Sequence, residues 1–236
     1  MDRLLKAKYR KGLDPREQPV YTIAEAARYL GINSQTLTTW LVGRPYETKA
    51  GRRTWQPVIK PADEKLRLLS FYNLAEAHVL AATRYEHEIP FWAVREAIKT
   101  IVKQYPKSRK HPLLADDFLT QGKEIFVKRV NELLNLSSPQ LSLAIMDSFL
   151  VRVLRDDDRN PFKVFPLRKG EEDDKVVSIV AGVASSRPII DSTGTPVLAV
   201  WRRFKAGEDP KYIAEDFEVE ISQVERAISY FERRAA

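Results

Sequence analysis

The chain has 236 residues, a formal net charge of +7 and no cysteine. This length is enough for one large or two small domains, and the hydrophobic share of 44% is ordinary for a globular protein. No apolar run approaches the ~20 residues of a membrane span, nothing near the start has the apolar core of a signal peptide, and disulfides and thiolate sites are excluded. We therefore expect a cytoplasmic protein without membrane contact.

The positive charge is concentrated in the first half of the chain. Residues 1–115 hold 21 Lys and Arg against 11 Asp and Glu, whereas residues 116–178 hold 10 against 12 and residues 179–236 hold 8 against 9. A concentrated basic surface attracts a polyanion, most simply DNA. Charge also keeps proteins soluble, so this observation alone leaves both explanations open.

Residues 21–41 have the pattern of two helices joined by a tight turn. Thr22 and Glu25 form a capping box that predicts the start of the first helix. Gly31 suits the left-handed residue that ends such a helix, and Asn33 is a suitable cap for the second helix.

The spacing of small and apolar residues in this stretch is that of a DNA-binding helix-turn-helix. Ala27 lets the helices approach, Gly31 makes the turn, and Leu37 and Trp40 seat the second helix. The other face of that second helix carries short hydrogen-bonding side chains that can meet base edges or phosphates, namely Ser34, Gln35, Thr36, Thr38 and Thr39. The alternative is a structural three-helix element with a polar solvent face.

A basic link follows the predicted recognition helix. Strands are predicted at residues 55–59 and 66–70. The link between the recognition helix and the first of these strands carries four cations, Arg44, Lys49, Arg52 and Arg53. We expect the link to form a wing whose cations contact DNA phosphates. Asn73 and Glu76 predict the start of a helix through about residue 85, and Pro90 predicts another through about residue 105.

Residues 20–105 resemble the MerR-type winged-helix domain. They combine a helix-turn-helix, a wing and two helices that begin near "FYNLAEAHVLAATRYEHEIPFWAVREAI". The resemblance implies a homodimer that reads a twofold DNA site, with the helix at 34–41 in the major groove. MerR regulators often sense metals, but His78 and His87 are not spaced to share a ligand on one helix face. We expect these two and His111 at the surface or at helix ends, and we expect no metal and no other cofactor.

The middle segment, residues 112–175, is predicted to mix helix and strand. Residues 118–119 and 125–127 suggest a hairpin, whereas the apolar run at 141–154 suggests a buried helix or an oligomer contact. A further strand is expected within 162–168.

The sequence shows no motif that is typical of a catalytic or cation-binding site. Asp156, Asp157 and Asp158 are three adjacent carboxylates, a pattern more typical of a solvated loop than of a cation site. Neither a nucleophile with base spacing nor a phosphate-binding glycine loop is present, so we expect no enzyme.

The last segment, residues 176–234, begins with a strand-like run and the stretch "SRPIIDSTGTPV". The residues before Pro188 and Pro196 are restricted to extended conformations, and Gly194 supplies a turn. Three short helices follow, and the last two are spaced like a second helix-turn-helix. Acidic residues surround this copy, which favours a protein-binding or dimerising module over a second DNA reader.

This segment resembles a small domain, formerly of unknown function, that is found in bacterial antitoxins. The matching residues are Arg187, Pro188, Asp191, Gly194, Thr195, Pro196, Ala206, Gly207, Ile213, Ala214, Glu215, Asp216 and Phe217. A MerR-like front joined to this tail is similar to the VapB-type antitoxins, which pair with a PIN-domain ribonuclease.

The resemblance implies an antitoxin that neutralises a PIN-domain toxin and represses its own operon by binding operator DNA. The residues assigned to toxin contact are Arg187, which could mask the toxin's active site, and Asp191, Trp201 and Arg202. The alternative function is a MerR-like, ligand-responsive transcription regulator with a C-terminal dimerisation module. Both functions imply a mainly α fold with minor β, comprising a winged helix-turn-helix, an α+β middle segment and a trihelical C-terminal domain.

Overall fold

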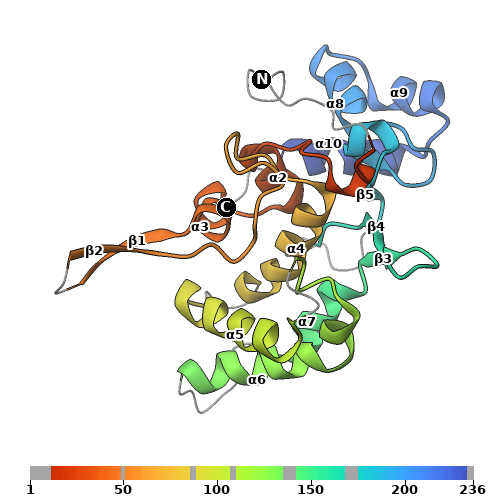
Figure 1. The fold of residues 1–236 in the computed structure, drawn as a ribbon. Helices are drawn as coiled ribbons and strands as arrows, with labels where there is room; N and C mark the ends of the chain where they lie inside the picture. The colour runs from red at the N-terminus through yellow and green to blue at the C-terminus, as the bar shows by residue number, and fades with distance from the viewer. Residues whose placement is uncertain are drawn as a thin grey trace.

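The computed structural model describes residues 12–48, 51–85, 89–106, 110–134, 142–167 and 175–232. These residues form a mainly helical fold with two small antiparallel sheets, as the sequence predicted (Figure 1). In the part of the chain that is described, no helix is long and apolar enough to cross a membrane.

The longer helices are α2 (Ile23–Leu30), α3 (Ser34–Val42), α4 (Phe71–Ala81), α5 (Phe91–Gln104), α6 (Lys123–Leu134), α7 (Leu143–Leu150), α8 (Val197–Lys205), α9 (Pro210–Phe217) and α10 (Ile221–Glu232). Shorter helical turns are η1 (Pro15–Glu17), η2 (Ala82–Arg84), η4 (Phe118–Gly122) and η5 (Val183–Ser186). The strands are β1 (Arg44–Thr48), β2 (Gly51–Trp55), β3 (Val153–Arg155), β4 (Pro161–Val164), β5 (Val177–Val180) and β6 (Pro188–Ile190).

Helices α2 and α3 form the predicted helix-turn-helix. The capping box of Thr22 and Glu25 is complete in both directions, and Gly31 ends α2 with φ of 66°. The side chain of Asn33 accepts a hydrogen bond from the Gln35 amide at 2.8 Å and so caps α3. The apolar face of α3 is buried, which fixes its orientation against α2.

The wing is built from different residues than the sequence suggested. Strands β1 and β2 pair in register from Arg44 with Trp55 to Thr48 with Gly51, so the basic link is itself the hairpin, which projects away from the body in Figure 1. The predicted strands at 55–59 and 66–70 are wrong. The amides of Val58 and Ile59 instead donate to the Trp40 carbonyl and hold a loop against the end of α3.

Helix α4 begins earlier than predicted and is buried along its entire length. The predicted cap at Asn73 and Glu76 is wrong, because Ser70 is the N-cap and Asn73 is the third residue of its capping box. Both predicted cap residues lie inside the helix. Helix α5 begins directly after Pro90, as predicted.

The predicted hairpin at 118–119 and 125–127 is wrong, because residues 118–134 are helical. The π-helical turn η4 continues into α6, whose buried side chains Phe126, Val127 and Val130 follow a helical period. Gly122 lies inside this run, where an added Cβ would be 3.1 Å from the Asp117 carbonyl oxygen. The glycine therefore permits close helical packing here and does not mark a turn.

The apolar run at 141–154 is only partly a helix. Helix α7 ends at Leu150, and the chain then enters β3, which leaves Val151 exposed. The sheet is antiparallel in the order β3-β4-β5-β6, and β4 and β5 lie where strands were expected.

The hydrophobic side chains form two clusters. The larger joins α2 to α7 with parts of the four-stranded sheet, and the smaller joins β5 and β6 to α8, α9 and α10. In the smaller unit, Gly194 makes a left-handed turn with φ of 75°, and Glu218 takes the left-handed position between α9 and α10 with φ of 53°. The division into three domains at the predicted boundaries remains a prediction.

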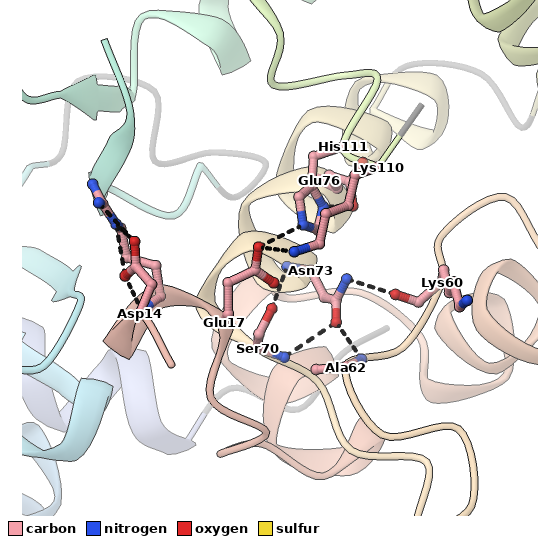
Figure 2. Close-up of polar contacts among 10 residues, drawn as sticks. Asp14, Glu17, Lys60, Ala62, Ser70, Asn73, Glu76, Lys110 and His111 are labelled. Atoms are coloured by element: carbon pink, nitrogen blue, oxygen red, sulfur yellow. Dashed lines mark hydrogen bonds and ion pairs between the residues drawn. The ribbon is translucent and has the colours of Figure 1, made fainter. Parts of the chain in front are cut away.

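Replacing Asn73 with alanine should strongly destabilise the fold. The buried Asn73 amide accepts from the Ala62 and Ser70 amides at 2.9 and 3.2 Å and donates to the Lys60 carbonyl at 2.9 Å (Figure 2). Because its loss leaves these backbone groups unpaired, we expect the free energy of unfolding to fall by about 3 kcal/mol in urea titrations. Gln56→Ala, at an exposed loop position, should change it by less than about 0.5 kcal/mol; equal effects would contradict this role.

Candidate DNA interface and the docked C-terminal domain

The predicted recognition helix α3 presents its polar face to solvent. Ser34 and Gln35 are exposed, whereas Thr36, Thr38 and Thr39 are half-buried. The Thr38 and Thr39 hydroxyls donate to the Ser34 and Gln35 carbonyls at 2.7 and 2.9 Å. Their hydrogens are therefore used within the helix, and Ser34 and Gln35 are the better donors for a base or phosphate.

The β1–β2 hairpin carries cations that were predicted to contact DNA phosphates. Arg44 and Arg53 are exposed on β1 and β2, and the Arg52 backbone lies in β2 opposite Glu47. Lys49 lies outside the described residues. The hairpin and α3 therefore bring most of the predicted DNA-binding residues to neighbouring elements, although their contact with DNA remains a prediction.

A hollow of about 580 Å³ lies between α3, the base of the wing and the start of α5. Gln35, Thr39 and Arg44 line it together with two residues that the sequence reasoning missed, Arg84 and Trp92. Trp92 is 38% exposed, which is unusual for an indole in a small protein. The only indication of this exposure in the sequence is that Trp92 lies in the first turn of a helix that begins directly after Pro90.

The C-terminal unit, residues 176–232, packs directly on α2. The buried Tyr230 hydroxyl donates to the Tyr29 carbonyl at 2.5 Å, and the Tyr21 hydroxyl donates to the Ser186 carbonyl at 2.7 Å. The Arg28 guanidinium lies 5.4 Å from the centre of the Phe231 ring. These contacts join segments that are far apart in the chain into one interface, hereafter the α2 interface.

A strained turn delivers the chain to this interface. Ala184, Ser185 and Ser186 have φ values of 46°, 55° and 58°, three successive residues in the left-handed region. Each such non-glycine residue costs about 1–2 kcal/mol. The surrounding contacts, among them the Gly182 amide donating to the Ser186 hydroxyl at 2.9 Å, hold the turn in place.

Arg187, a predicted toxin contact, is engaged inside the α2 interface. Its guanidinium pairs with Glu25 at 3.0 Å and donates to the Tyr29 hydroxyl at 3.3 Å and to the Val20 carbonyl at 3.2 Å. The side chain is 27% exposed. In this conformation Arg187 is an anchor between the C-terminal unit and the helix-turn-helix.

The other predicted toxin contacts lie in different surroundings. Asp191 pairs with Lys163 at 2.6 Å and accepts from the Ser178 hydroxyl at 2.6 Å, beside the four-stranded sheet. Trp201 stacks against Phe231 with ring centres 4.6 Å apart, while Arg202 is exposed on α8. Their role with a toxin remains a prediction.

The prediction that the histidines lie at the surface or at helix ends is wrong for two of them, and His87 lies outside the described residues. His78 is in the middle of α4 and only 1% exposed, and its Nε2 donates to the Phe149 carbonyl at 3.0 Å. Burial lowers the pKa of His78 to about 3, so this ring is neutral.

His111 bridges two glutamates at the edge of the main core (Figure 2). Its Nδ1 lies 2.9 Å from Oε2 of the buried Glu76, and its Nε2 lies 3.5 Å from Oε1 of Glu17. Lys110 also reaches Glu17 at 2.5 Å. The cluster therefore ties η1 and the residue-111 segment to α4.

The pKa values of Glu76 and His111 are both raised. Burial raises the pKa of Glu76, although its hydrogen bond with His111 opposes that rise. Burial alone would lower the pKa of His111, but the contacts with Glu76 and Glu17 raise it above its ordinary value. The described residues contain no group of three or more His, Cys, Asp or Glu placed to hold a metal ion.

Two families match this arrangement of a helix-turn-helix front and a trihelical tail. Residues 19–98 match the "Putative DNA-binding HTH domain" family, and residues 177–231 match the family "Protein of unknown function (DUF433)". A curated protein of Mycobacterium tuberculosis, "Putative antitoxin VapB45", is 27% identical over 231 residues, covering 89% of this chain and 92% of its own. The chain is therefore similar to VapB45 over most of its length.

The fold of this chain is also found in a solved structure. The crystal structure of Rv2018 from Mycobacterium tuberculosis superposes with a TM-score of 0.64 at 23% identity, covering 89% of this chain and 97% of the other. The similarity therefore extends over the front, middle and C-terminal parts.

The Glu76–His111 contact should make stability depend on pH. Because the folded state raises the pKa of His111 above 6.5, its contribution is complete below that pH and is lost as pH rises through the folded value. The pKa of Glu76 is also raised in the folded state, so its contribution to stability likewise falls as the pH rises above 4.5. We expect the free energy of unfolding to fall between pH 6 and pH 8.5, and to fall less in Glu76→Gln.

Urea titrations at the two pH values measure this difference. Glu124→Gln, an exposed carboxylate on α6, is the control and should keep the wild-type pH dependence. An identical pH dependence in Glu76→Gln and in the wild type would refute the assignment.

Proposed function

We propose that this chain is the antitoxin of a type II toxin–antitoxin pair. As a homodimer it binds operator DNA and represses its own operon, and it also binds and neutralises a PIN-domain ribonuclease. The observation that carries the proposal is that the C-terminal unit packs on helix α2 of the helix-turn-helix. The polar face of the second helix, α3, remains exposed and can still contact DNA. The chain itself is proposed to catalyse no reaction.

DNA binding by the front is supported by shape and charge together. Helix α3 offers Ser34 and Gln35 as donors and acceptors for base edges, and Arg44 and Arg53 lie on the adjacent ribbon. The excess of cations in residues 1–115 adds a field that attracts phosphate. A twofold operator would be read by two copies of this arrangement.

Toxin binding is supported by the relationship to VapB45, which covers the C-terminal unit as well as the front. In that unit α9, α10 and the turn between them carry exposed acidic residues, including Glu215, Glu218 and Glu225. Such a surface repels DNA and suits a protein partner.

Removing two wing cations should weaken DNA binding and reduce its dependence on salt. For Arg52→Ala combined with Arg53→Ala, we expect the slope of log Kobs against log salt to fall by about 1.8, because each lost phosphate contact removes about 0.9. Fluorescence anisotropy with the promoter DNA of the operon measures this. Lys128→Ala with Arg129→Ala, on α6, is the matched control; an unchanged slope in the wing variant would remove the wing from the DNA interface.

Affinity purification of the full-length chain from its native host should yield a stoichiometric PIN-domain nuclease, identified by mass spectrometry. The purified nuclease should cleave RNA alone and lose that activity when the chain is added. Recovery of only the chain itself and DNA would contradict the antitoxin function.

A further inference from the structure

Three hollows adjoin one another on the face formed by α5, the loop at 56–67 and η1. Their volumes are about 900, 440 and 520 Å³. Lys110 lines all three, Lys60 lines the first and second, and His111 lines the second and third. The three hollows therefore lie side by side, and together they are called the Lys110 groove hereafter.

The widest part of the groove has an apolar floor and a cationic rim. One wall is a single stripe of α5 with helical spacing, in which Ile98 and Val102 alternate with Lys99 and Lys103. The opposite wall is the loop after the wing, which contributes Val58 to the floor. A stripe of this kind facing a loop is suited to an occupant with aliphatic side chains on one side and charges along its flanks.

The rim carries an excess of positive charge. Lys60 pairs with Glu64 at 3.1 Å, and Lys99 pairs with Glu96 at 3.0 Å. Within the described parts of the chain, the rim cations Arg67 and Lys103 have no acidic partner. An acidic occupant would supply the missing partners, because complementary charge across an interface favours association and fixes its register.

The extent of the groove favours a stretch of polypeptide. Sites for small molecules occupy roughly 300–1,000 Å³ and bury most of the ligand, whereas here a hollow of about 900 Å³ has two others, of about 440 and 520 Å³, directly beside it. The far end is lined by charges of both signs, Arg155 and Arg159 with Asp116 and Asp158. A chain segment can place different side chains along such a path.

We propose that the Lys110 groove holds a segment of the toxin with acidic and aliphatic side chains. This inference rests on the proposed antitoxin function and gives the toxin a second contact surface, separate from the C-terminal unit. The acidic end of the segment lies against Lys99 and Lys103, and its aliphatic side chains lie on Ile98 and Val102. The DNA-facing residues of α3 take no part in this contact.

Charge reversal on α5 tests the proposal with the full-length chain and the purified toxin. Lys99→Glu with Lys103→Glu should weaken toxin binding at least tenfold in titration calorimetry. Lys128→Glu with Arg129→Glu makes the same change of charge on α6, outside the groove, and should bind toxin within twofold of the wild type. Circular dichroism checks that both variants are folded.

A photo-crosslinking residue at Val102 identifies the occupant. We expect a crosslink to an acidic toxin segment, and replacing the acids of that segment with lysine should restore binding to the Lys99→Glu, Lys103→Glu variant. Wild-type toxin affinity in that variant, or a crosslink to a second copy of this chain or to a small molecule, would overturn the groove proposal and leave the antitoxin function standing. No toxin binding by the wild-type chain would instead contradict the antitoxin function itself.

Discussion

A helix that is buried on every side must find a partner for each polar side chain that it carries, and α4 meets this demand with segments from distant parts of the chain. Asn73 binds the backbone of the loop at 60–62, Glu76 binds His111, and His78 binds the end of α7. An unpaired polar group at any of these sites would cost more than an ordinary hydrogen bond contributes. The polar groups of α4 therefore fix the position of three neighbouring segments.

The functional surfaces depend on this arrangement. The loop held by Asn73 continues from the wing, and its Val58 and Ile59 amides close on the carbonyl of Trp40 at the base of α3. The same loop forms one wall of the Lys110 groove, and His111 stands at the junction of its second and third hollows. Recognition helix, wing and groove thus share one frame, while the C-terminal unit is anchored separately on α2.

Local signals in the sequence predicted the helix-turn-helix. Thr22 with Glu25 and Gly31 act on backbone groups within a few residues, so they can be recognised from the sequence alone. The candidate recognition residues follow from that frame because the buried positions Leu37 and Trp40 leave one face of α3 to solvent.

The remaining features depend on contacts that sequence spacing does not reveal. Residues 118–127 suggested a hairpin, yet Gly122 lies in a helical run, where an added Cβ would be only 3.1 Å from the Asp117 carbonyl oxygen. Glu76 was expected to cap the start of a helix, whereas it is buried inside α4 and paired with a histidine 35 positions later. Arg187 was predicted as a toxin contact, but in this structure its partners lie more than 150 positions earlier in the chain.

The α2 interface can form only late in synthesis, because it joins early and late segments of the chain. Tyr21 and Tyr29 emerge early in synthesis, but their partners Ser186 and Tyr230 lie 165 and 201 positions later. The helix-turn-helix can form from local contacts while the surface of α2 that receives these partners is still uncovered. A chain interrupted before its last helix would therefore leave Tyr29 uncovered and open to proteases and chaperones, whereas the completed chain buries it.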